Sequence, residues 1–165
     1  AQSTARAFSG TSWFAQDLAE STDQFLVSPS IDLPAAGQEP ISLAFWNFQN
    51  MEANDGEGAD ACWDGGLLEI STDSGSTFTQ IQAAQLLRDP YNGLITNNAS
   101  SPISDLNAWC ADDILPASGA QTDFVVADLD DFAGQTVQFR FRLGTDAFVG
   151  DEGWYIDNVT VQGCQ

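Results

Sequence analysis

The sequence predicts an all-β protein, an antiparallel jelly-roll β-sandwich with long loops. Apolar and polar residues alternate in several short runs, which is the period of a strand with one buried face. The segments between these runs are rich in Gly, Asp, Asn and Pro, which favour turns. Helical periodicity is nearly absent, and only residues 83–87 are interpreted as a helical turn. Short strands joined in this way are typical of sandwiches with jelly-roll connections.

The chain has the length and apolar content of a single domain. It has 165 residues, of which 43% are hydrophobic, and a globule of this size buries roughly 70% of its extended-chain surface. We therefore expect one domain over residues 1–165, with residues 1–10, which are small and polar, as a linker or arm. No internal repeat of about 20 to 50 residues is visible, which argues against a solenoid or a propeller.

Four strands are predicted in the first half of the chain. Residues 25–33 contain Pro29, which cannot donate to a central ladder, so they are interpreted as an edge strand. Residues 41–48 alternate clearly and form a strand with a buried face. The strand around Leu68 and Ile70 turns at residues 73–75 and returns as a hairpin.

Regular alternation resumes in the second half, at residue 123. The clearest strand has one unbroken apolar face, formed by Val137, Phe139, Phe141 and Leu143. The last strand, residues 151–161, changes phase: Trp154 and Ile156 lie on one face, whereas Val159 and Val161 are one residue out of step. Such a slip predicts a β-bulge at Asp157 and Asn158, and a bulge re-aims a side chain.

Two long connections carry cysteines. Cys62 lies in the acidic loop 51–66, and Cys110 lies in the weakly periodic stretch 83–115. We predict a disulfide between Cys62 and Cys110, with Cys164 unpaired. By closing a loop of nearly fifty residues, this bond would stabilise the folded state by about 4 kcal/mol. The alternative is three buried thiols in a reducing compartment. A zinc site has too few usual ligands, because the chain has no His and no Cys-x-x-Cys.

The charge balance excludes several partners. The chain has 24 acidic residues against four Arg and no Lys, which gives a net charge of −20. Nucleic acids and anionic membranes are repelled, because binding them requires basic side chains that neutralise phosphates. There is no run of about 18 apolar residues, so no membrane insertion is expected. There is also no basic-then-apolar start, so the chain is expected to be cytoplasmic or already processed.

The acidic loops predict a calcium site. Calcium takes six to eight oxygen ligands, which Asp-, Asn- and Gly-rich loops supply. The candidate ligands are Glu52, Asp64, Asp146, Asp151 and Asp157. Asp64 and Asp157 are the strongest of these because each lies against apolar residues of a strand, where a carboxylate needs a cation or several donors. The alternative is a solvated acidic surface, and no EF-hand spacing is present.

Catalysis has little support in the sequence, and we expect a protein that is not an enzyme. Without His or Lys, the chain lacks the bases that usually activate a nucleophile. A carboxylate pair for glycoside hydrolysis stays open as an alternative. Sugar rings could stack on Trp63, Tyr91 and Trp109, although Trp63 and Trp109 could instead pack around the disulfide.

Residues 64–75, 133–146 and 153–161 resemble bacterial MAM-like jelly-roll accessory domains of secreted peptidases, including immune-inhibitor-A-like metalloproteases. The resemblance covers residues 26–161 and extends to calcium-containing carbohydrate-binding-module sandwiches. It implies secretion, a covalently linked catalytic domain, and a non-catalytic role in targeting a protein or polysaccharide substrate or in adhesion. It also implies a structural calcium ion, with Glu52, Asp64, Asp146 and Asp157 at acidic positions of that family. Two alternatives remain: a carbohydrate-binding module of an extracellular glycanase, and a domain that only stabilises its parent protease.

Overall fold

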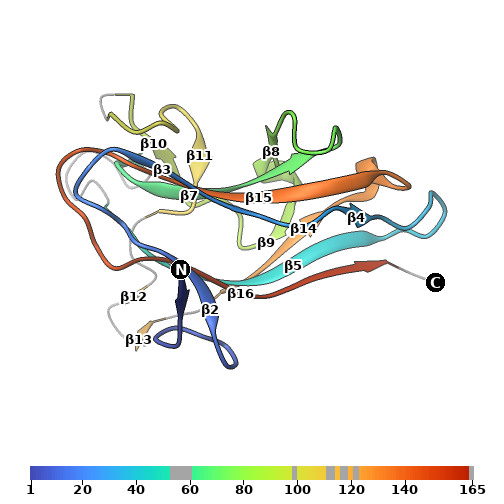
Figure 1. Cartoon of the computed structure of the whole chain (residues 1–165), viewed down its shortest axis with the longest axis horizontal. Helices are drawn as coiled ribbons and strands as arrows, with labels where there is room; N and C mark the ends of the chain where they lie inside the picture. The colour runs from blue at the N-terminus through green and yellow to red at the C-terminus, as the bar shows by residue number, and fades with distance from the viewer. Residues whose placement is uncertain (53–60, 98–99, 111–113, 116–118, 121–122, 164–165) are drawn as a thin grey trace.

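The computed structural model describes residues 1–52, 61–97, 100–110, 114–115, 119–120 and 123–163. Two main sheets stack as the layers of a sandwich (Figure 1). In order across the first sheet, the strands are β1 (Gln2–Ser3), β2 (Ser12–Ala15), β16 (Gly153–Gly163), β5 (Ile41–Asn50), β14 (Asp123–Asp128) and β9 (Leu86–Arg88). Across the second sheet they are β3 (Thr22–Val27), β15 (Thr136–Thr145), β7 (Gly65–Ser71) and β8 (Thr79–Gln80), with β4 (Ile31–Asp32) also paired to β15.

All strand pairs within these two sheets are antiparallel. The predicted all-β sandwich is therefore confirmed, while its jelly-roll connectivity stays a prediction. The described helical elements are two short 3₁₀ turns, η1 (Ala83–Gln85) and η2 (Asp130–Phe132). The first of them lies where the sequence indicated a single turn.

The core lies between β5 and β15, the two strands with the clearest alternation. Leu43 and Phe45 of β5 point inward and are fully buried, and they meet the apolar face of β15. The rings of Phe45 and Phe141 pack edge to face with centroids 5.0 Å apart, a geometry that aromatic pairs favour. Each such buried side chain stabilises the fold by about 1.5–3 kcal/mol.

The stretch 83–115 contributes β9 to the first sheet and also forms small strands, which pair with two strands from outside the stretch. A three-stranded sheet consists of β11 (Asn107–Ala108), β10 (Gly93–Ile95) and β6 (Ala61–Cys62), and a separate pair consists of β12 (Ile114–Leu115) and β13 (Gly119–Ala120). Cys62 and Cys110 form the predicted disulfide, with Cα atoms 6.1 Å apart. Cys164 lies outside the described residues.

The phase change in the last strand is a β-bulge, as predicted. Along β16, Asp157 is opposite Trp46 of β5 and Thr160 is opposite Ala44, so β16 has one extra residue. Asn158 absorbs the extra residue with a φ of 52°, a left-handed conformation that Asn tolerates better than most residues.

Residues 1–10 are attached to the sandwich. They contribute β1, which pairs with β2, and the segment that follows crosses the outer face of the first sheet. Arg6 forms a two-pronged ion pair with Glu152, with N···O distances of 2.9 and 2.8 Å. Phe8 stacks on Trp46 with ring centroids 4.7 Å apart. The segment interpreted from its composition as a linker or arm is thus anchored by strand pairing, an ion pair and ring stacking.

Candidate metal centre

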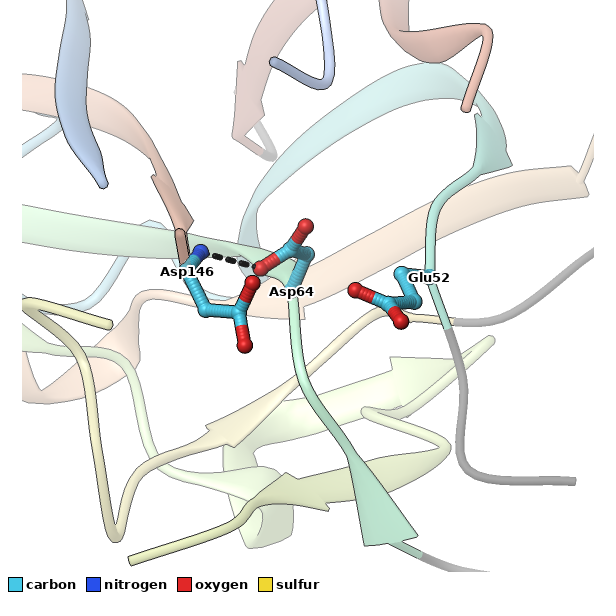
Figure 2. Close-up of side chains that lie close together, drawn as sticks. All are labelled: Glu52, Asp64 and Asp146. Atoms are coloured by element: carbon cyan, nitrogen blue, oxygen red, sulfur yellow. Dashed lines mark hydrogen bonds between the residues drawn. The ribbon is translucent and has the colours of Figure 1, made fainter. Parts of the chain in front are cut away.

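Three carboxylates meet where several strands begin or end. Glu52 follows β5, Asp64 precedes β7, and Asp146 follows β15. These positions lie at one end of the sandwich, because β7 begins opposite the end of β15 and β5 ends opposite the start of β16. One carboxylate oxygen from each residue lies within 4.8 Å of the others. Figure 2 shows the three side chains converging from separate segments of the chain.

Close packing of the backbone fixes Asp64. The residue is fully buried, and its Oδ1 accepts the backbone N–H of Asp146, so β7 and the β15–β16 loop are joined at this point. The two glycines that follow let the start of β7 pack closely against other neighbours: a Cβ at Gly65 would lie 2.7 Å from Ala108, and one at Gly66 would lie 2.7 Å from the ring of Trp154. The Asp-Gly-Gly sequence therefore places a carboxylate at the edge of the core.

A fourth carboxylate, Asp17, joins the cluster from the connection between β2 and β3. It is buried, and its Oδ2 accepts the backbone N–H groups of Glu52 and Asp151, both at 3.1 Å. The carboxyl groups of Asp17 and Asp64 are close enough to share a hydrogen bond when one of them is protonated. Asp17 thus holds two acidic loops together. The sequence analysis missed it because no strand was expected at residues 12–15, and so nothing placed residue 17 at this end.

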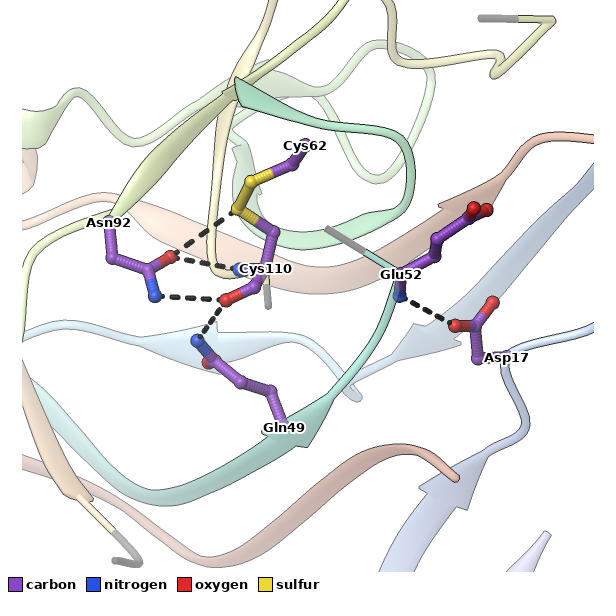
Figure 3. Close-up of a disulfide and its surroundings, with 6 residues drawn as sticks. All are labelled: Asp17, Gln49, Glu52, Cys62, Asn92 and Cys110. Atoms are coloured by element: carbon purple, nitrogen blue, oxygen red, sulfur yellow. Dashed lines mark hydrogen bonds between the residues drawn. A yellow bond between two sulfur atoms is a disulfide. The ribbon is translucent and has the colours of Figure 1, made fainter. Parts of the chain in front are cut away.

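The disulfide lies near the same end. Gln49, at the end of β5, donates its side-chain N–H to the carbonyl of Cys110 at 2.9 Å, and Asn92 donates to the same carbonyl at 2.9 Å. Asn92 also accepts the backbone N–H of Cys110 at 2.9 Å. Figure 3 shows this network on one side of the end of β5 and the contact between Glu52 and Asp17 on the other. The end of β5 is therefore held from both sides.

The cluster carries more negative charge than the described residues neutralise. Three buried carboxylate oxygens of the cluster have no hydrogen-bond partner among the described residues: Asp17 Oδ1, Glu52 Oε2 and Asp64 Oδ2. The ion pairs among the described residues engage Glu152, Glu69 and Asp23, all outside the cluster. An uncompensated buried carboxylate is costly, so the cluster needs either protons or a cation.

The pKa values reflect this shortage of positive charge. Burial raises the pKa of Asp64 to about 9, and the adjacent Asp17 carboxyl adds to the rise. Burial also raises the pKa of Asp17 and that of Glu52, with the charge of Asp146 contributing at Glu52. Raised pKa values on several neighbouring acids are expected where a bound cation would replace the protons.

The donor set suits a hard divalent cation. The converging ligand atoms are carboxylate oxygens, which calcium and magnesium prefer. No His or thiolate belongs to the group, so zinc and softer metals lack their usual ligands. The residues present therefore fit a hard divalent cation, which would satisfy the unpartnered oxygens.

Two of the five predicted ligands lie outside this group of three. Asp151 is adjacent, because its backbone N–H binds Asp17 and its charge contributes to the raised pKa of Glu52. Asp157 lies at the bulge in β16, and its carboxylate accepts the backbone N–H groups of Ser9 at 3.1 Å and Asn158 at 2.7 Å. Its donors come from the N-terminal segment and from its own turn, so the structure does not bring Asp157 to the cluster.

The three aromatic residues considered for ligand binding do not form an exposed surface. Trp109 is fully buried, and its indole N–H donates to the carbonyl of Asp89 at 3.0 Å. The Tyr91 hydroxyl donates to the backbone carbonyl of Ile81 at 3.0 Å, and its ring packs on Trp109 with centroids 4.5 Å apart. Trp109 therefore packs in the core and offers no ring face to a ligand. Trp63 is half-buried, and its role in binding stays a prediction.

Comparisons with known proteins do not assign a family to the chain. No family model matches it, and no curated protein has a significantly similar sequence. The resemblance to MAM-like accessory domains therefore stays a prediction. Among the described residues, no helix has the length and apolar character needed to span a membrane.

Proposed function

We propose that this protein is a non-catalytic, calcium-stabilised accessory module of a secreted bacterial enzyme of the peptidase class, and that it serves in substrate targeting or adhesion. One observation carries the calcium part of the proposal. The carboxylates of Glu52, Asp64 and Asp146 converge beside the buried Asp17, and three oxygens of these four residues lack a partner among the described residues. A divalent cation would neutralise them and tie together segments that are far apart in the sequence.

Each acidic residue has a distinct part in this proposal. Glu52, Asp64 and Asp146 supply oxygen ligands, because their carboxylates converge. Asp17 positions the loops through the N–H groups of Glu52 and Asp151, and its free oxygen faces the same region. The ion contributes charge neutralisation, and the role is structural.

Calcium binding should depend on Asp64 and not on Asp157. In isothermal titration calorimetry of chelator-treated protein, we expect Asp64→Asn to weaken calcium binding by at least about 100-fold, since the loss of even an outer-shell partner costs 10–100-fold. The amide keeps an acceptor for the N–H of Asp146. Asp157→Asn is the matched control and should bind as the parent does. Equal loss in both variants, or no binding by the parent at millimolar calcium, would contradict the calcium proposal.

Three features support an extracellular accessory role. The disulfide is consistent with an oxidising compartment. The sequence lacks His and Lys, the usual catalytic bases. Its charge of −20 disfavours nucleic acids as ligands. The alternative of a carbohydrate-binding module gains no support from Trp109 or Tyr91, because the structure buries the first and engages the hydroxyl of the second.

Deleting residues 1–165 from the parent enzyme separates targeting from stabilisation. The targeting role predicts that the truncated enzyme turns over a small soluble substrate normally and loses activity on a surface-bound protein by about tenfold or more, because local substrate concentration falls. Both activities are measured on matured enzyme, with the Asp157→Asn full-length enzyme as control. Failure of the truncated enzyme to mature would instead favour the role of stabilising the parent protease.

A further inference from the structure

The sandwich is open along one side, between β2 of the first sheet and β3 of the second. A cleft of about 230 Å³ lies there, and apolar residues of both layers line it. Its main lining side chains are Trp13, Leu26, Phe141, Leu143, Trp154 and Ile156. Trp13 of β2 is paired with Ile156 of β16, so both side chains lie on the same side of the first sheet. Ile156 is buried, whereas Trp13 is 46% exposed. An inward-facing indole thus borders space that the protein does not fill.

The strand beside this cleft has a free edge. β3 is the terminal strand of its sheet, and it pairs with β15 on one side only. Ser28 donates its N–H to Phe139 at 2.9 Å, and hydrogen-bonded positions alternate along an antiparallel strand. Residues 24 and 26 therefore also face β15, whereas the backbone groups of Asp23, Phe25 and Val27 point outward. No described residue pairs with that outer edge.

Exposed apolar side chains border the same edge. Phe25 is 51% exposed and Val27 is 45% exposed, on the outer face of β3. A long, accessible edge with apolar flanks is a template for a further strand, and proteins usually block such edges. Side chains on both faces of an added strand would find apolar contacts. Those on the inner face would enter the cleft, and those on the outer face would contact Phe25 and Val27.

The negative charge of the protein favours a basic segment as the ligand of this edge. Glu20 lies just before the start of this edge, Asp32 lies beyond its end, and the whole chain carries a charge of −20. Arg140 and Arg142, on the neighbouring strand, are already paired with Glu69 and Asp23. A second copy of the chain would bring like charges together, whereas a basic segment would be attracted.

We propose that the free edge of β3 and the adjoining cleft bind an extended, basic polypeptide segment as an added strand, with one aromatic or large aliphatic side chain in the cleft. An engineered cavity of about 150 Å³ holds benzene, so the cleft has room for one such ring. Strand addition obtains affinity from backbone hydrogen bonds and specificity from pockets for alternate side chains. The inference rests on the proposed targeting role and names the partner's chemistry; the cleft shares no residue with the acidic cluster.

The test uses a fluorescent peptide in which lysine alternates with valine and phenylalanine, and it is read by anisotropy. We expect saturable binding that Val27→Pro weakens by about tenfold or more, because proline removes an outward N–H of the edge. Val27→Ala keeps that N–H and should change the affinity less than about threefold. Trp13→Ala should also weaken binding of the phenylalanine-containing peptide. When that phenylalanine is replaced by alanine, the unaltered protein and Trp13→Ala should bind the peptide with nearly equal affinity. Peptide N-methylated at alternate residues should fail to bind the unaltered protein, which tests the edge even if Val27→Pro does not fold.

Three outcomes would overturn the inference. The first is binding that survives both Val27→Pro and N-methylation and vanishes at about 0.5 M salt, which indicates charge attraction alone. The second is the absence of saturable binding, and the third is a dimer that Val27→Pro dissociates, which assigns the edge to a second copy. The measurements are made with calcium and with chelator. A calcium response without peptide binding would refute this inference alone, and peptide binding without a calcium response would refute the calcium proposal alone.

Discussion

Freed of divalent cations, the protein is expected to become more stable as the pH falls from about 9 toward 5, and millimolar calcium is expected to oppose this trend. The cause is Asp64, whose pKa is raised by burial from 3.8 to about 9 in the fold. Between these two values the folded state holds a proton that the unfolded state has released. The free energy of unfolding therefore decreases as the pH rises through this window.

Calcium replaces the proton, so its binding should strengthen as the pH rises. At free calcium about 100 times the dissociation constant, the expected stabilisation is about 2.7 kcal/mol. For a chain of this length, that corresponds to a rise in melting temperature of about 5–11 °C. The measurement is a series of thermal melts by circular dichroism at several pH values, with calcium or with chelator.

Asp64→Asn provides the decisive comparison. In chelator the variant should be more stable than the parent at pH 8, because the amide needs no proton to remain buried, and its stability should vary less with pH. It should also lose the response to calcium. Asp157→Asn, whose carboxylate lies outside the cluster, should keep the behaviour of the parent. A parent and an Asp64→Asn variant with the same pH dependence would refute the assignment of the trend to Asp64.

Removal of the Cys62–Cys110 disulfide is expected to destabilise the protein by about 4 kcal/mol, since the bond closes a loop with a sequence separation of 48. In a chain of this size, that loss lowers the melting temperature by about 8–16 °C. The bond also holds the carbonyl of Cys110 where Gln49 and Asn92 bind it, so its loss should loosen the end of β5. The loosened end includes the segment that presents Glu52.

The double variant Cys62→Ala/Cys110→Ala, made in a Cys164→Ala background, is compared with that background by thermal and urea unfolding. The background removes the third thiol and prevents disulfide exchange. We expect the double variant to bind calcium more weakly as well as to melt earlier. A melting temperature within about 2 °C of the background would show that the covalent link adds little to the existing packing.

The strand that the sequence predicted best, β15, has one apolar and one largely polar face. β15 shows the two-residue alternation because Val137, Phe139, Phe141 and Leu143 face inward and most of its outer positions are polar. β5 was predicted from Ile41, Leu43 and Phe45, although Trp46 and Phe48 on its outer face are also apolar and are covered by Phe8 and Arg6. β2 was not predicted because its consecutive residues Trp13 and Phe14 are both apolar, although their side chains face opposite sides of the sheet. Phe14 packs on Tyr155 on the outer face, with ring centroids 4.5 Å apart. In a strand of only four residues, aromatics on both faces leave no alternation to read.

The same limitation explains the candidate metal centre. Glu52, Asp64 and Asp146 were accessible to sequence reasoning because each adjoins a recognised strand or its flanking loop. Asp17 follows the unrecognised strand β2, so nothing indicated its position. Asp157 adjoins a strand as well, but the bulge directs its carboxylate to Ser9. Sequence patterns can locate the ends of strands, whereas the direction of a side chain at a bulge depends on the three-dimensional neighbours.

The anchoring of residues 1–10 sets a practical boundary for protein engineering. An expression clone that began at residue 11 would lack β1 and uncover the rings of Trp46 and Phe48, on which Phe8 and Arg6 now lie. It would also leave Glu152 without the guanidinium that lowers its pKa, one residue after Asp151. An N-terminal affinity tag or fusion partner should therefore be joined to residue 1 through a spacer. Removing residues 1–10 would remove β1 and the contacts that anchor this segment to the first sheet.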